Sequence, residues 1–102
     1  MDMKKMMKQA QKMQRDAAAA QQEIAVMTFE ASAGGGMVKA TATGEMAITD
    51  ITIDPAAVDP EDVEMLQDMV VAAVNEALRA ASEAANARMN AVMGGMKIPG
   101  LM

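Results

Sequence analysis

The sequence predicts an α+β fold in which an N-terminal helix, a three-stranded antiparallel sheet and a long C-terminal helix follow one another. Three observations support this prediction. Apolar residues recur at helical spacing in the first quarter of the chain. In the middle of the chain apolar and polar residues alternate, as in β-strands. Asp59-Pro60 then opens an alanine-rich segment with the signals of a helix start.

Composition limits the chemistry that this fold can perform. The 102 residues suffice for one domain with a modest core. The sequence has no histidine, no cysteine and a single aromatic residue, Phe29. The commonest metal ligands, the commonest general base and the thiol nucleophile are therefore missing. We expect no enzyme, no metal or cofactor, no small-molecule substrate and, without a long apolar run or signal peptide, no membrane partner.

The first helix is predicted over residues 2–22, and it has two different faces. Its apolar positions alternate by three and four residues, as in a helix that packs against another helix; this seam comprises Met3, Met6, Ala10, Met13, Ala17, Ala20 and Ile24. Five basic residues fall within an arc of roughly 100° on the opposite face. We call these five residues the cationic stripe: Lys4, Lys5, Lys8, Lys12 and Arg15.

The stripe makes the charge of the chain uneven. Residues 1–15 contain five basic side chains and one acid, a net charge of +4, so the rest of the chain carries −9 of the total of −5. Lysine-rich faces are common merely for solubility, but such faces usually alternate their signs to form ion pairs. Only Asp16, at the edge of this face, offers such a pair, which favours a charged partner for the first helix.

The first strand is predicted over residues 25–32 and is followed by three glycines at 34–36. A phosphate-binding loop would place such glycines before a helix N-terminus. A second strand, 37–43, follows instead, so we interpret the glycines as a hairpin loop. The second strand places Val38, Ala40 and Ala42 on one face, and small side chains there would let a helix approach closely.

A turn at Gly44-Glu45 leads to the third strand, predicted over residues 46–53. Strict alternation would place Ala47, Thr49, Ile51 and Ile53 on one face and Met46, Ile48, Asp50 and Thr52 on the other. Asp54 could be a catalytic acid. It has no partner base and precedes a proline, however, so we expect its carboxylate to cap nearby backbone N–H groups.

The last helix is predicted from Asp59 to about Val92, where Gly94-Gly95 stops it. Residues 1–93 would thus form the domain, and we expect a mobile tail over residues 94–102. A helix of some thirty residues spans roughly 45–50 Å, whereas a seven-residue strand spans less than about 25 Å. The helix must overhang its sheet, so we expect projecting helical arms and a homodimer joined through the sheet and adjoining helix faces.

These residues together resemble a known family. The runs VKATATG at 38–44 and ITIDP at 51–55, the segment VNEA at 74–77 before Arg79, and Arg88-Met89 ahead of Gly95-Met96 look like the YbaB/EbfC family of bacterial nucleoid-associated proteins. The opening MKQAQKMQ at 7–14 is similar as well. The resemblance implies a cytoplasmic, nucleoid-associated, non-catalytic protein that binds duplex DNA as a homodimer with helices protruding like tweezers.

The resemblance also implies which basic residues bind DNA. Lys8, Lys39, Arg79 and Arg88 match basic positions of the family, and the rest of the stripe enriches the same helix. The candidate DNA-binding residues are therefore Lys4, Lys5, Lys8, Lys12, Arg15, Lys39, Arg79 and Arg88. Family members can carry arginines on the third strand where this chain has residues 47–50, ending in Asp50, so DNA contact through the sheet is not expected here.

Two other functions remain open from the residues alone. The helical arms could dock a protein, such as a recombination or chromosome-maintenance partner, because the seam is rich in methionine. A basic amphipathic helix could also lie on a membrane surface, but the first helix lacks the Trp, Phe and Leu anchors of such helices. Duplex DNA bound largely without sequence preference is the function that we predict.

Overall fold

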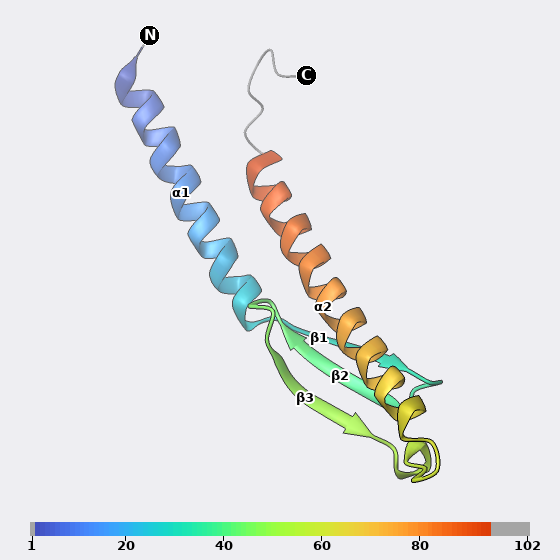
Figure 1. Ribbon diagram of the computed structural model, residues 1–102. Helices are drawn as coiled ribbons and strands as arrows, with labels where there is room; N and C mark the ends of the chain where they lie inside the picture. Colours follow the sequence, from blue (N-terminus) through green and yellow to red (C-terminus); the bar gives the residue numbers. More distant parts are fainter. Residues whose placement is uncertain (1, 95–102) are drawn as a thin grey trace.

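The computed structural model describes residues 2–94 and confirms the predicted α+β fold (Figure 1). The elements are α1 (Met3–Val26), β1 (Thr28–Ala33), β2 (Val38–Thr43), β3 (Ile48–Ile53), the short 3-10 helix η1 (Pro55–Ala57) and α2 (Val63–Gly94). The described part is elongated and measures 72 × 26 × 16 Å. The predicted mobile tail lies outside the described residues, apart from Gly94, which ends α2.

Helix α1 is longer than predicted, and the first strand is correspondingly shorter. Ala25 and Val26 were predicted to begin the strand, yet they remain helical, and Ile24 beside them packs its side chain, only 5% exposed, on the inside of the arm. The helix ends where Met27 becomes extended and its N–H donates to the Ile24 carbonyl at 3.1 Å. At the other end, Asp2 caps the helix by accepting from the Lys4 N–H.

Helix α2 begins later than predicted, because Asp62 and not Asp59 caps it. Asp59 accepts from the Glu61 N–H at 2.9 Å and caps only a turn. Asp62 accepts from the Met65 N–H at 3.2 Å, the bond of a helix N-cap, so α2 starts at Val63. The prediction for Asp54 is confirmed, since its carboxylate accepts from the Ala56 N–H at 2.9 Å at the start of η1.

The three strands form one antiparallel sheet in the order β1-β2-β3, with a β-bulge that the sequence did not reveal. Thr41 pairs with Asp50 and Ala42 with Ile48, so Thr49 is the extra residue. The bulge moves Ile48 to the same face as Ile51 and Ile53, which corrects the strict alternation expected for this strand. Ala47, which strict alternation placed on the same face as Ile51 and Ile53, is exposed.

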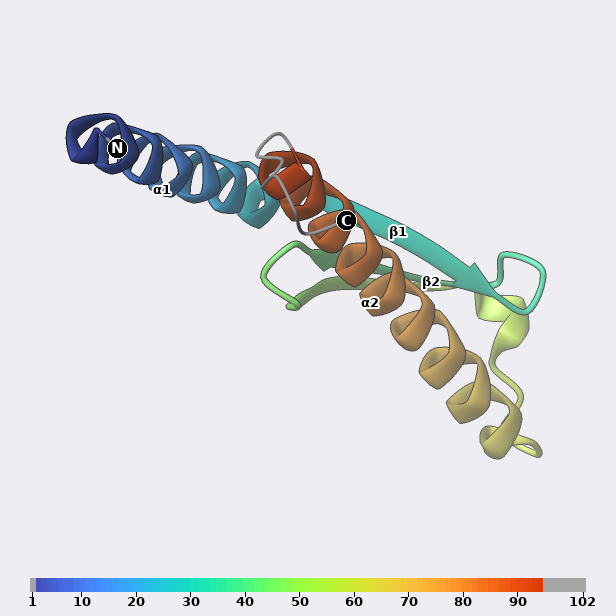
Figure 2. The ribbon, with the colours of Figure 1, turned by 90° about the horizontal axis from the view of Figure 1, so that it is seen from above.

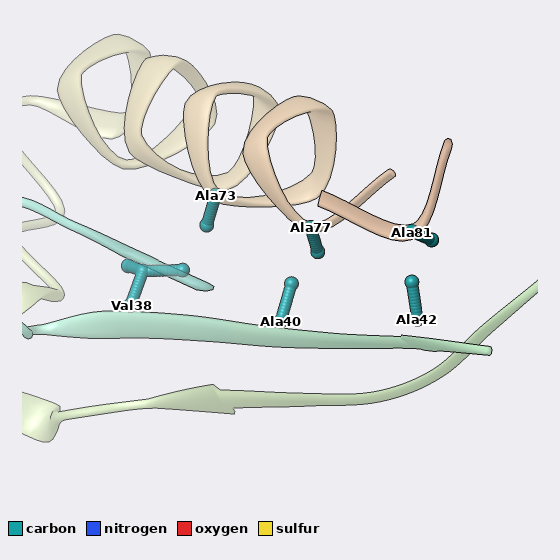
Figure 3. Packing of buried hydrophobic residues seen from close by; sticks show 6 residues of the cluster. All are labelled: Val38, Ala40, Ala42, Ala73, Ala77 and Ala81. Atoms are coloured by element: carbon teal, nitrogen blue, oxygen red, sulfur yellow. The ribbon is translucent and has the colours of Figure 1, made fainter. Parts of the chain in front are cut away.

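The core is a close contact between α2 and the sheet. Figure 3 shows three alanines of α2 pointing at the apolar face of β2. All six residues of this contact are at most 1% exposed: Val38, Ala40, Ala42, Ala73, Ala77 and Ala81. The expected close approach of a helix to small side chains is confirmed for β2. Because α2 lies over β1 and β2, Ile51 and Ile53 of β3 remain 41% and 38% exposed on the same face.

Helix α1 packs against α2 beyond the end of the sheet. Ala20 and Ile24 are buried, and Met13 and Ala17 are half-buried, so the predicted seam is confirmed in this part. Its first part has no partner among the described residues, because Met3 and Met6 are 74% and 55% exposed. Figures 1 and 2 show why: the N-terminal part of α1 extends past the end of α2.

Candidate nucleic-acid interface

The cationic stripe lies on the projecting arm formed by α1. Asp2 fixes the start of this helix, and the buried seam residues Ala20 and Ile24 fix its rotation on α2. The stripe is thereby turned away from the seam, and all five of its residues are exposed. The structure thus brings together five of the eight predicted basic residues, all on one face of one helix.

The stripe has no internal counter-charges. In residues 2–94, the ion pairs within 4.0 Å involve only Arg79 and Arg88, so none of the five stripe cations is paired with a carboxylate there. Asp16, which could have paired with Lys12 one turn away, does not do so. An array of unpaired cations on one face has a strong positive potential and attracts polyanions.

A groove of about 510 Å³ separates α1 from the C-terminal part of α2. The groove is lined by Lys12, Met13, Asp16, Ala19, Glu23, Arg88, Ala91 and Val92. Arg88 crosses from α2 to α1, where its Nε donates a hydrogen bond to Oε2 of Glu23 at 3.0 Å and its Nη2 lies 3.0 Å from the same oxygen. Arg88 therefore lines the same groove as Lys12, a residue of the stripe.

Arg79 is held by its own helix. Its guanidinium pairs with Glu76 and Glu83, one turn before and one turn after it. Hydrogen bonding to Arg79 lowers the pKa of Glu76, and the same bond together with the charges of both glutamates raises the pKa of Arg79. With two carboxylates as partners, this cation contributes little net positive potential to its surroundings.

Lys39 lies apart from the other basic residues. It projects from the face of the sheet opposite α2, between Ser32 of β1 and Thr52 of β3. This pairing is four residues along β1 from Thr28, where α1 joins the sheet, a distance of about 13 Å. The strand residues facing the same way include two acids, Glu30 and Asp50, so this face is not a cationic surface.

Sequence reasoning missed the carboxylate that faces Arg88. Glu23 and Arg88 are 65 residues apart, and only the antiparallel packing of the arms brings them together. The sequence did contain a partial signal, since Glu23 lies at about the same angular position around α1 as Lys5. Glu23 is thus on the edge of α1 where the face of the stripe borders α2.

The described part of the chain has neither a metal-binding cluster nor a membrane-spanning helix. No group of three or more Asp, Glu, His or Cys side chains is arranged there to hold a metal ion. Neither helix is both long enough and apolar enough to cross a membrane.

Comparison with known structures supports the fold. The chain is similar to the crystal structure of an uncharacterized protein from Helicobacter pylori, with a TM-score of 0.72 and 23% sequence identity. The match covers 95% of this chain and 99% of the other. The arrangement of two long helices around a small sheet therefore exists in an experimentally determined protein.

Comparison with known sequences gives the family. The chain is 52% identical over 101 residues to a nucleoid-associated protein of Ruminiclostridium cellulolyticum, covering 98% of this chain and 88% of the relative. It is 57% identical over 97 residues to a nucleoid-associated protein of Acetivibrio thermocellus, covering 94% and 86%. The model of the YbaB/EbfC DNA-binding family matches residues 1–96. This chain therefore belongs to the YbaB/EbfC DNA-binding family.

Proposed function

We propose that this protein binds duplex DNA as a homodimer, largely without sequence preference, and that the cationic stripe of α1 is its main contact. The observation that carries the proposal is the row of five exposed cations that have no carboxylate partner in residues 2–94. Lysine and arginine side chains bind backbone phosphates and release the counterions condensed on DNA. A dimer would offer ten such groups.

The lack of sequence preference follows from the residue types. Four of the five stripe residues are lysines, whose ammonium groups act as point charges toward phosphates. The one aromatic residue, Phe29, is half-buried beside the core, so it is not a platform on which bases could stack. Contacts of this kind position a protein on the DNA backbone and carry no sequence information.

The other predicted basic residues contribute unequally in this proposal. Arg88 adds to the stripe because it lies across the groove from Lys12. Arg79 contributes less because Glu76 and Glu83 already pair with it. Lys39 also contributes less, because Glu30 and Asp50 share its face of the sheet.

The homodimer in this proposal is supported by apolar surface that α2 leaves uncovered. Ile51 and Ile53 lie on the same face of the sheet as the buried core residues Val38 and Ala40, but near its β3 edge. A second copy packed on this strip would bury the remaining exposed two-fifths of both residues, worth about 1 kcal/mol each. The two arms of each copy would remain free to contact DNA.

The test is a gel shift on duplexes of several sequences, titrated with salt. For the wild type we expect similar affinity for all duplexes and a log–log salt slope of about −0.9 per phosphate neutralised. Changing all five stripe residues to glutamine should reduce affinity by at least about tenfold at 50 mM salt and flatten the slope.

A charge-preserving variant provides the control. Changing Lys4, Lys5, Lys8 and Lys12 to arginine keeps every positive charge, so it should bind DNA about as well as the parent. Sedimentation and far-UV circular dichroism should show that both variants keep the oligomeric state and helix content of the parent. If the glutamine variant is folded and binds as well as the parent, the stripe is only a solubility face.

A second candidate function is favoured by the apolar half of the projecting arm. Met3, Met6 and Met7 are all more than half exposed, and flexible thioethers suit adaptable protein contacts. The arms would then dock a protein partner, such as one involved in recombination or chromosome maintenance. Absence of DNA binding at low salt, with the dimer intact, would favour this candidate over the first.

The relatives that are named nucleoid-associated proteins suggest where this function is carried out. We propose that this protein also acts on the bacterial nucleoid, in the cytoplasm. Fluorescence microscopy of a tagged copy should show it overlapping the stained chromosome, and an even distribution through the cell would contradict the proposal.

A further inference from the structure

The groove between the arms contains an ion pair that bears directly on DNA binding. We infer that Glu23 occupies the place of a DNA phosphate: it holds Arg88 in the free protein, and a backbone phosphate replaces it at Arg88 when DNA binds. This inference rests on the proposed function. It adds a phosphate site at the groove and makes Glu23 a positioning residue that competes with the ligand.

The contact between Arg88 and Glu23 is of a kind that a phosphate oxygen can also make. The Nε of Arg88 donates to Oε2 of Glu23 at 3.0 Å, and Nη2 lies 3.0 Å from the same oxygen. Guanidinium groups bind carboxylate and phosphate oxygens in the same manner, with the same pairs of N–H donors. Arg88 is therefore already oriented for an anionic oxygen in the groove.

The pair is accessible and can be exchanged. The side chains of Arg88 and Glu23 are 45% and 57% exposed, and ion pairs of this exposure contribute little to stability. The groove beside them has a volume of about 510 Å³, which is larger than a phosphate group. An incoming phosphate would only need to displace one exposed carboxylate.

The charges in the groove explain why displacement would matter. Lys12 and Arg88 are balanced by Asp16 and Glu23, so the groove lining is neutral in the free protein. Lys12 also belongs to the stripe, so the groove continues the cationic face of α1 onto α2. A phosphate bound at Arg88 would extend the DNA contact from one helix to both.

The test compares Glu23→Gln with the matched control Glu30→Gln. Both variants remove one negative charge, but Glu30 is exposed on the outer face of the sheet, away from the groove. We expect Glu23→Gln to bind duplex DNA severalfold more tightly than the parent with about the same salt slope, because both make the contact between Arg88 and a phosphate but only the parent must first break the ion pair. Glu30→Gln should keep the parental affinity and slope.

Arg88→Gln tests the other half of the pair. This variant should have a shallower salt slope than the parent, and the double variant with Glu23→Gln should match Arg88→Gln alone, because Glu23 acts only through Arg88. A purely structural pair would behave differently: Glu23→Gln and Arg88→Gln would both loosen the arms and weaken binding to the same extent.

The outcomes separate this inference from the proposed function. If the parent binds DNA and the stripe variant does not, but Glu23→Gln has the affinity and slope of Glu30→Gln, the inference is wrong and the proposed function stands. Weaker binding by Glu23→Gln would also overturn the inference. If the parent shows no salt-dependent binding at all, both are wrong.

Discussion

Three alanines of α2 determine how closely the helix approaches the sheet. Ala73, Ala77 and Ala81 are fully buried against β2, and a methyl group is the largest side chain that this spacing accommodates. The methionines that make up so much of the composition lie mainly around this contact or on the surface. The centre of the fold is therefore specified by small residues.

Ala77→Leu tests this spacing. Three extra carbon atoms between α2 and β2 would force the helix away from the sheet, and overpacking of this kind typically costs 1–3 kcal/mol, so we expect a loss of about 2 kcal/mol. Urea unfolding at a fixed protein concentration would measure it. Ala72→Leu, at an exposed position of the same helix, is the matched control and should change the free energy of unfolding by less than about 0.5 kcal/mol.

Individual residues differed in how well the sequence predicted them. The role of Asp54 could be predicted because its hydrogen bond is local, two residues along the chain. The stripe could be predicted because helical periodicity alone places its residues on one face. The pairing of Arg88 with Glu23 could not be predicted, because it depends on how the two helices pack against each other, and no local sequence pattern indicates this packing.

At the level of elements, the turn between β2 and β3 fixes where α1 ends. Gly44 donates its N–H to the Met27 carbonyl and lies directly against the last turn of α1. The same turn leads into β3, whose bulge at Thr49 then reverses the facing of Ile48. Strict alternation could not predict this reversal, because a bulge adds one residue without any distinctive side chain to mark it.

Gly44→Ala tests the contact between the turn and α1. A Cβ atom at this position would lie 1.8 Å from the Ile24 carbonyl oxygen, so the backbone of one element must move. We expect a loss of about 2 kcal/mol and a melting temperature lower by about 10 °C. Glu45→Ala, at the exposed neighbouring position, should melt close to the parent. Equal melting temperatures for the two variants would show that the backbone of the turn can move to admit the Cβ atom without loss of stability.

At the scale of the whole molecule, the shape leaves one strip of apolar surface without cover. Helix α2 spans β1 and β2 but not β3, and the arms project beyond the sheet. Helix length alone predicted that the arms would project, because it can be compared with strand length. The location of the uncovered strip could not be predicted, because it depends on the bulge and on the path of α2 over the sheet.

Ile51→Glu tests whether this strip joins two copies. The parent should sediment at twice the chain mass of 10.7 kDa, and the variant at the mass of one chain, because a glutamate in the interface would be buried without a partner. The variant should remain folded by circular dichroism, since residue 51 is 41% exposed within a single chain. With half as many stripe cations on each particle, its salt slope for DNA binding should fall to about half.

Thr52→Glu is the matched control for this experiment. It adds the same charge to the same strand, one residue away, but on the face of the sheet opposite α2. If the dimer interface is on the Ile51 side of the sheet, this variant should stay dimeric and keep the parental salt slope for DNA binding. If Thr52→Glu dissociates and Ile51→Glu does not, the two copies meet through the polar face of the sheet instead. The distance between the arms of the two copies on DNA would then differ, because each copy would face its partner with the opposite side of its sheet.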